Sequence, residues 1–362
     1  MALGSPHPGC EPVRATEGPA PVAPRAPGGL CARSFLPRSA WAALMLLAGA
    51  LPGALPVTAW AADCNTVPAC ITQLRFGETR AQREFAARVL GERGSPVAVP
   101  ALVEALKSDQ GDYVRALSAH ALGLIGESGA TAPLVEALRT DKQAPVRAAA
   151  AAALAHFAGA DAVSALSTAA RGDADAGVRV AAVAALGDIG APEAVAAVGA
   201  ALAADARREV RMRAAQALVR VKGAPGIAAL KKALAGDADA AVRAQAALAM
   251  GEIEDPALSE ALLAALESDR ELAVRQAAAQ SLGKRRDTKA VLALIRVVQR
   301  DSALEVRQEA AVALGRVGGP EALEALSYFA DHSVLPQVRR TAAEVLEEYA
   351  ARLQPAAPAQ DR

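Results

Sequence analysis

A single dipeptide, Val-Arg, recurs along the chain at a constant interval of 32 residues. In this register it occurs eight times, from Val114-Arg115 to Val338-Arg339, without an insertion or deletion between occurrences. One further step towards the N-terminus reaches Arg83, which gives about nine units. A fixed period of this length is the signature of a repeat architecture, in which each unit packs only on its neighbours. The period therefore predicts one continuous array and excludes a set of unrelated globular domains.

Each unit has the pattern of two helices joined by a short acidic turn. Residues 192–202 place proline at a position that helices tolerate and repeat apolar residues at helical spacing. Residues 178–187 carry the Val-Arg dipeptide and end at Gly187, which suits a helix C-terminus. Asp112, Asp175 and Asp239 are expected to be N-caps of the second helices. Neither helix can bury its apolar stripe alone, so neighbouring units must supply the missing face.

Composition favours helices over strands. Hydrophobic residues make up 53% of the chain, but aromatic residues make up only 3% and alanine dominates. Alanine is the best helix former, whereas strands favour β-branched and aromatic residues. We therefore expect an all-α protein, an α-α superhelix (an armadillo- or HEAT-like solenoid) of about nine helix pairs over residues 62–353.

The repeated pattern Asp-x4-Val-Arg-x2-Ala-Ala-x-Ala-Leu-Gly-x-Ile-Gly resembles the HEAT repeat. It is most similar to the short bacterial form called the phycobilisome-lyase HEAT-like repeat, and the resemblance covers about residues 66–352. The resemblance implies an armadillo-like superhelix with the second helix of each pair on the concave side. It also implies that the repeated aspartates and arginines form a structural ladder between turns, although a column of arginines could instead bind phosphate, sulfate or an acidic partner. The predicted ladder residues are Asp109, Arg115, Asp141, Arg147, Asp173, Arg179, Asp205, Arg211, Asp237, Arg243, Asp269, Arg275, Asp301 and Arg307.

The first 61 residues have the features of a secretory signal peptide preceded by an N-terminal extension. Arg33 and Arg38 precede an apolar run over residues 40–57, and Ala59 and Ala61 form an A-x-A cleavage site. The alternative is a membrane anchor, but the run is short and is interrupted by prolines. We expect residues 1–61 to be a disordered extension plus a secretory signal peptide, and residues 354–362 to be a disordered tail. The protein is expected to be secreted, into the periplasm or out of the cell.

Two cysteines remain after the leader is removed. Cys64 and Cys70 are six residues apart at the start of the array, which suits a small disulfide loop in an exported protein. The alternatives are two free thiols, or Cys70 filling a core position. Two cysteines without a nearby histidine make a poor metal site.

No catalytic or cofactor-binding pattern is recognisable. His120, His156 and His332 fall at different positions of the repeat, so the period does not bring them together as metal ligands. Deoxyhypusine hydroxylase, a HEAT-repeat enzyme, binds two irons through His-Glu dipeptides, and this chain contains none. The formal net charge is zero, with 39 basic and 39 acidic residues, which argues against a nucleic-acid partner. We therefore expect no metal, no cofactor and no catalytic residues.

The remaining function is binding. If the second helices face inwards, the positions one, two and five residues after each arginine are accessible, and in the third and fourth units these are small apolar residues. They are Ala148, Ala149, Ala152, Val180, Ala181 and Ala184. Such a floor could accept a helix or an extended peptide, although tight packing alone could also explain the alanines. The sequence predicts a non-catalytic, monomeric scaffold for a protein or peptide partner; the competing class is a HEAT-repeat enzyme of the lyase or hydroxylase type.

Overall fold

The computed structural model describes residues 64–353, all within the second of the two units of the chain, residues 56–362. The extension, the signal peptide and the C-terminal tail expected from the sequence lie outside the described residues. Between residues 64 and 353 there are 18 α-helices and no strand, which confirms the all-α expectation.

The helices form nine consecutive pairs within the described region, each pair corresponding to one 32-residue unit. Their bounds are α3 Val67–Phe76, α4 Arg80–Arg93, α5 Val99–Ser108, α6 Asp112–Ile125, α7 Thr131–Thr140, α8 Ala144–Leu154, α9 Ala160–Gly172, α10 Ala176–Ile189, α11 Val195–Ala204, α12 Arg208–Val221, α13 Ala224–Gly236, α14 Ala240–Gly251, α15 Ser259–Ser268, α16 Leu272–Lys284, α17 Val291–Arg300, α18 Leu304–Val317, α19 Pro320–His332 and α20 Pro336–Leu353. Odd-numbered helices are the first of a pair and even-numbered helices are the second.

Local sequence explains how these helices begin. Pro192 opens a short 3₁₀ turn, Pro192–Ala194, that leads directly into α11, so the first helix is split where one continuous helix was expected. Asp175 and Asp239 are N-caps whose carboxylates accept hydrogen bonds from backbone amides, as expected. Asp112 is not an N-cap: it is the first residue of α6, and Gly111 occupies the cap position.

The repeated glycine of the second helices does not end them, which corrects the expectation for Gly187. Helix α10 continues to Ile189, and Gly190, with a positive φ of 68°, provides the left-handed C-cap. Gly187 lies instead against the next second helix, where an added Cβ would stand 2.8 Å from the Cβ of Ala217. The glycine is therefore required for a close approach between successive second helices.

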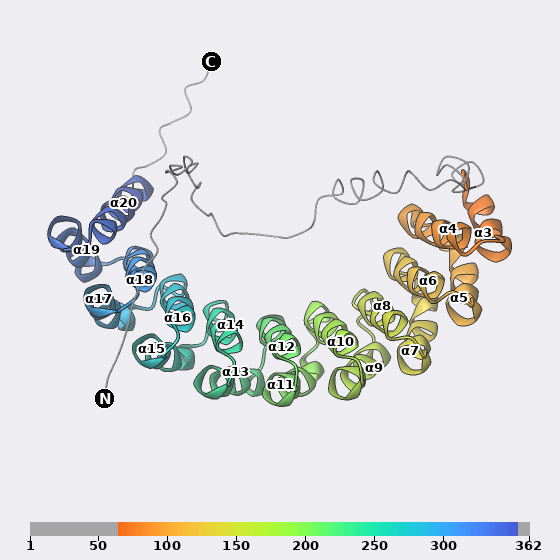
Figure 1. The fold of residues 1–362 in the computed structure, drawn as a ribbon, viewed down its shortest axis with the longest axis horizontal. Helices are drawn as coiled ribbons and strands as arrows, with labels where there is room; N and C mark the ends of the chain where they lie inside the picture. Colours follow the sequence, from red (N-terminus) through yellow and green to blue (C-terminus); the bar gives the residue numbers. More distant parts are fainter. Residues whose placement is uncertain (1–63, 354–362) are drawn as a thin grey trace, which may run out of the picture. The chain divides into compact units, whose positions relative to one another are not determined.

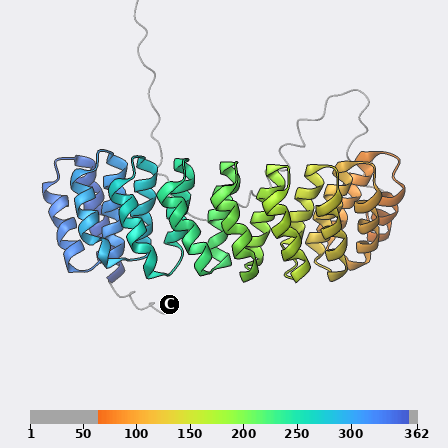
Figure 2. The same ribbon diagram turned by 90° about the horizontal axis from the view of Figure 1, so that it is seen from below.

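Second helices pack closely on one another, whereas successive first helices make far fewer contacts in every unit except at α11 and α13. The nine pairs consequently follow a curve with the even-numbered helices on its inner side (Figure 1). Seen from below, the pairs stand side by side in a single row (Figure 2). The second helices, which carry the Val-Arg dipeptides, therefore form the inner face of the array.

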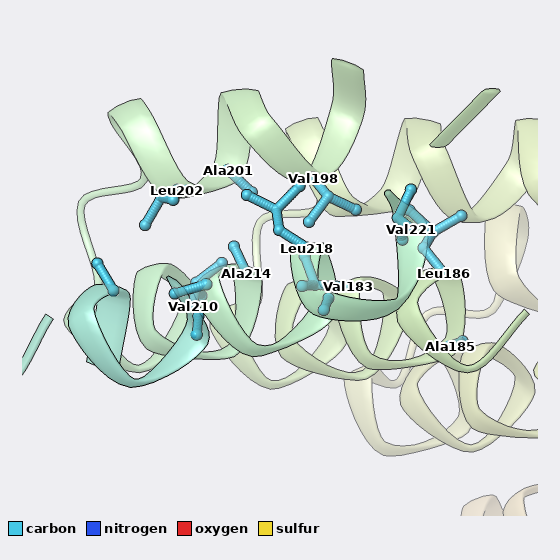
Figure 3. Close-up of a cluster of buried hydrophobic side chains, with 14 of the residues drawn as sticks. Val183, Ala185, Leu186, Val198, Ala201, Leu202, Val210, Ala214, Leu218 and Val221 are labelled. Carbon is cyan, nitrogen blue, oxygen red and sulfur yellow. The ribbon is translucent and has the colours of Figure 1, made fainter. Parts of the chain in front are cut away.

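A continuous apolar core runs between the two rows of helices. Figure 3 shows Val198 of α11 beside Leu218 of α12, and both side chains are buried. The valine of each Val-Arg dipeptide is fully buried, as at Val210. Burying such a side chain contributes about 1.5–3 kcal/mol. The valine thereby anchors each second helix in the core and fixes the position from which its arginine leaves.

Candidate functional site

The repeated arginines tie each unit to the next. Arg115 donates from Nε to Oδ2 of Asp141 at 2.7 Å and from Nη2 to Oδ1 of the same carboxylate at 3.0 Å. Its Nη1 donates to the backbone carbonyl of Asp109, in its own unit, at 2.9 Å. The same paired geometry occurs in seven rungs: Arg83–Asp109, Arg115–Asp141, Arg147–Asp173, Arg179–Asp205, Arg211–Asp237, Arg243–Asp269 and Arg275–Asp301.

The carboxylate of each rung belongs to the following unit. The aspartate six residues before an arginine contributes its carbonyl, while the aspartate 26 residues after it contributes its carboxylate. That carboxylate also accepts a hydrogen bond from the amide two residues further on, as Asp141 does from Gln143 at 2.9 Å. Only 14% of the Arg115 side chain and 10% of the Asp141 side chain are exposed. These guanidinium groups are therefore occupied and shielded, and they do not offer a row of anion sites.

Protonation states follow from this geometry. Partial burial alone would raise the pKa of Asp141, but the hydrogen bonds from Arg115 and from the amide of Gln143 outweigh burial and hold the pKa below its usual value. The same carboxylate raises the pKa of Arg115. Asp173, Asp205 and Asp301 have lowered pKa values for the same reasons. The rungs are ion pairs at neutral pH.

Arg307 departs from the ladder, although the repeat register assigns it there. Position 333, where its aspartate would stand, is a serine. Within residues 64–353 no carboxylate pairs with Arg307, and its Nε donates to the carbonyl of Asp301. The prediction that Arg307 forms an ion pair of the ladder is therefore wrong, because the acidic column ends one unit before the arginine column.

The predicted floor residues lie on α8 and α10, in the inner row. Ala152 is exposed, and the others are half-buried, so that their small side chains are accessible without projecting. The set comprises Ala148, Ala149, Ala152, Val180, Ala181 and Ala184. The corresponding positions of the two preceding units are mixed: Phe85, Ala116 and Leu117 pack partly against the core, but Glu84, Arg88 and His120 are polar. The six predicted residues make a small apolar strip on α8 and α10, which we call the apolar floor (residues 148, 149, 152, 180, 181 and 184).

Polar residues interrupt the same positions in the C-terminal half. Gln276 and Gln280 occupy them in α16, and Gln308 donates from Nε2 to the hydroxyl of Thr341 at 3.1 Å. Glu309 is partly buried there, and burial raises its pKa even though Arg316 lies 3.4 Å away. The uninterrupted run of small apolar residues is thus confined to α8 and α10, and polar side chains occur at these positions on both sides of it.

His120 and His156 interact electrostatically, although the sequence analysis did not pair them. Burial lowers the pKa of His120, and the charge of His156 lowers it further. Their separation of 36 residues is one repeat plus one helical turn, a signal that combining the two periods would have revealed. Over residues 64–353, however, no cluster of three or more metal-ligating side chains is present.

The N-terminal end of the array is closed by a disulfide between Cys64 and Cys70. Both cysteines are buried in the apolar core, and Cys70 lies within α3. Across the described helices, none is both long enough and apolar enough to cross a bilayer.

Known structures share the architecture. The karyopherin Kap121p bound to Ste12p is 14% identical with a TM-score of 0.56, and the match covers 87% of this chain and 41% of that one. Human deoxyhypusine hydroxylase is 24% identical over 73% of this chain and 98% of its own, with a TM-score of 0.32. The CpcE–CpcF phycocyanin lyase from Nostoc is 22% identical over 78% and 94%, with a TM-score of 0.36. The karyopherin match shows a common fold, and the two lower scores support no inference.

Sequence comparison is more specific. No curated protein matches the chain at a significant level. The family model for HEAT repeats matches in overlapping stretches, namely residues 67–155, 131–219, 198–281, 227–308 and 259–347. These stretches cover nearly all of the helical array, and the chain belongs to the HEAT repeat family.

Proposed function

We propose that this HEAT-repeat array is a non-catalytic scaffold that holds a protein or peptide partner on its inner face. The observation that carries the proposal is the apolar floor, whose small side chains are accessible along α8 and α10. A helix or an extended segment can lie on such a surface because no large side chain projects from it. The karyopherin Kap121p, which shares the fold, forms a complex with Ste12p, and this supports partner binding by a similar array.

The proposed setting is the periplasm or the cell exterior, with the protein as a monomer. The leader-like composition before residue 62 and the disulfide between Cys64 and Cys70 support export, since such bonds persist in oxidising compartments. Export would separate the protein from nucleic acids, and the balanced net charge also argues against them.

The test is the substitution of two floor residues by aspartate, Ala149→Asp together with Ala181→Asp. Immobilised protein is incubated with a periplasmic extract, and captured proteins are identified by mass spectrometry. Aspartate places charge on the apolar floor, so we expect capture to fall at least tenfold while circular dichroism shows unchanged helicity. The matched control is Ala132→Asp with Ala228→Asp, because both alanines are exposed on first helices, α7 and α13. Equal losses in the two variants, or none in the floor variant, would remove the proposal.

The competing class is a HEAT-repeat enzyme of the lyase or hydroxylase type. The absence of His-Glu dipeptides from the sequence argues against an iron-dependent hydroxylase. Metal analysis of the purified protein separates the two classes. About two irons per chain would replace the scaffold proposal by an enzymatic one.

A further inference from the structure

Every closed rung of the ladder presents the same three hydrogen-bond donors to one carboxylate. At Asp301 they are Nε and Nη2 of Arg275, at 2.7 and 2.9 Å, and the amide of Ala303 at 2.8 Å. The guanidinium and the amide come from different units, so the carboxylate sits between them. These donors define a small, shielded site built for a carboxylate group.

The next position retains the donors and lacks the carboxylate. Arg307 occupies the arginine column, and the amide of Leu335 occupies the amide column, but residue 333 is serine. The Leu335 amide lies 3.4 Å from the Ser333 hydroxyl, a long and weak contact compared with the amide–carboxylate bonds of the closed rungs. The position of the missing carboxylate between Arg307, Ser333 and Leu335 is called the open rung.

The Arg307 guanidinium has also turned. In the closed rungs Nη1 donates to the carbonyl six residues upstream, as Arg275 does to Asp269 at 2.9 Å, and Nε and Nη2 are left for the carboxylate. In Arg307 the bond to the Asp301 carbonyl is made by Nε. Neither Nη group of Arg307 has an acceptor within residues 64–353, although the residue is half-buried. A planar guanidinium with two free Nη groups can bind a carboxylate through both.

Charge around the open rung is unbalanced. Elsewhere, arginines and aspartates alternate along the ladder, but nine arginines from Arg83 to Arg339 meet only seven carboxylates. Arg339 donates from Nη1 to the Ser333 carbonyl at 2.6 Å and has no carboxylate partner among the described residues. Asp331 and Glu305 are exposed nearby in sequence, and His332 stacks on Tyr328 with ring centroids 4.7 Å apart. Arg307 and Arg339 are thus the two arginines of the column without a carboxylate partner among the described residues.

We propose that the open rung is a binding site for a carboxylate supplied from outside the chain. The Arg307 guanidinium, the Ser333 hydroxyl and the Leu335 amide would surround it as the donors of a closed rung surround an aspartate. Val334, whose surface is 86% exposed, stands at the same turn and would contact the apolar part of the ligand. The carboxylate can be an aspartate or glutamate side chain of a partner protein or the C-terminus of a peptide. This proposal does not depend on the apolar floor.

Thermal unfolding in sodium acetate and in sodium chloride, at equal ionic strength and pH 7, tests the site. A ligand that binds only the folded state raises Tm, so acetate should raise the Tm of the wild-type protein by about 2 °C relative to chloride. Ser333→Asp places the chain's own carboxylate in the rung, and Arg307→Gln removes the guanidinium. Both variants should lose the acetate effect, and Ser333→Asp should also raise Tm in chloride alone.

Ser128→Asp is the matched control, because Ser128 is exposed in the turn before α7, far from the ladder, and this variant should keep the acetate effect. Two further probes distinguish the sources of the carboxylate. N-acetylvaline carries a terminal carboxylate and an apolar side chain, whereas the α-amide of N-acetylaspartate carries only a side-chain carboxylate. The probe that raises Tm more identifies the source. A wild-type Tm that is equal in acetate and chloride, or an acetate effect that survives in Ser333→Asp, would overturn the proposal.

Discussion

Two regions of the array can be compared, the middle, α9 to α12, and the C-terminal third, α15 to α20. Both keep the 32-residue register, but different residues occupy several of its positions. In the middle, Gly187 meets Ala217, whereas near the C-terminal end Gly315 meets the larger Val345. The middle rung Arg179–Asp205 is closed, but the C-terminal rung at Arg307 is open. In both regions the second helices nevertheless pack on one another, because the buried valine and leucine columns continue through both. The core therefore sets the register, and the glycine and ladder columns adjust stability within it.

The junction between α10 and α12 should be the most sensitive point of the middle region. Gly187→Ala would place a Cβ 2.8 Å from Ala217 Cβ and 3.0 Å from its Cα, so the helices would have to separate. We expect a loss of about 3 kcal/mol in the free energy of unfolding, measured by urea denaturation. Gly172→Ala is the control: an added Cβ there meets nothing within 4 Å, and alanine should be neutral or stabilising. Equal effects of the two substitutions would show that close helix approach is not the reason for the glycine.

How far the sequence could predict the structure depends on which kind of information each feature needs. The helix pairs and the core were predictable, because Val178 and Leu186 recur at a constant period that only stacked units can satisfy. The ion-pair partner of Arg179 was not predictable, because two aspartates of the same column are candidates. They are Asp173, six residues before the arginine, and Asp205, 26 residues after it. A constant period cannot say which of the two supplies the carboxylate. Only the spacing between stacked units decides, and it assigns the carboxylate to Asp205 and the carbonyl to Asp173.

The position of Gly187 was equally ambiguous in sequence, since glycine serves both helix ends and close contacts. The predicted floor residues lie on helices of the inner row because the register carries over from unit to unit. Its usefulness as a binding surface could not be derived, since accessibility depends on the curvature that the glycine contacts impose. The open rung could have been found in the sequence by noting that the aspartate column ends at Asp301 while the arginine column continues.

Removing a carboxylate from a closed rung should make the middle of the array resemble its C-terminal end. Asp205→Asn leaves Arg179 in place without its ion pair, in a site where only 13% of the arginine side chain and 7% of the aspartate side chain are exposed. We expect a loss of about 2 kcal/mol at pH 7, measured by urea denaturation. Arg340→Gln is the control, because Arg340 is exposed and its ion pair with Glu344 should contribute almost nothing.

The effect of Asp205→Asn should depend on pH in a defined direction. Partial burial alone would raise the pKa of Asp205, but the hydrogen bond from Arg179 helps to lower it below the unfolded value of about 3.9. A carboxyl group with a lowered pKa stabilises the folded state above its unfolded pKa, and this contribution is lost as the pH falls through the folded pKa. The difference between wild type and variant should therefore be constant from pH 7 to about 5 and shrink below about 4. A difference that stays the same down to pH 3 would assign the loss to packing instead of ionisation.

The smallest expected effect concerns the residues that end the second helices. In the middle, Gly190 ends α10 with a φ of 68°, but at the equivalent position after α16 Arg286 has a φ of 52°. A side chain in this left-handed region costs roughly 1 kcal/mol relative to glycine. Arg286→Gly should therefore raise the free energy of unfolding by about 0.5–1 kcal/mol and make the two helix ends alike.

The equivalent residue after α14, Glu254, is the control for Arg286→Gly, because its φ is not positive and glycine there relieves no strain. Glu254→Gly should be neutral or slightly destabilising in the same urea experiment, since glycine increases the entropy of the unfolded chain. If Arg286→Gly is also destabilising, the arginine must contribute contacts that outweigh its backbone strain. In that case Arg286 makes a stabilising interaction at this helix end, and Gly190 makes none at the equivalent position in the middle region.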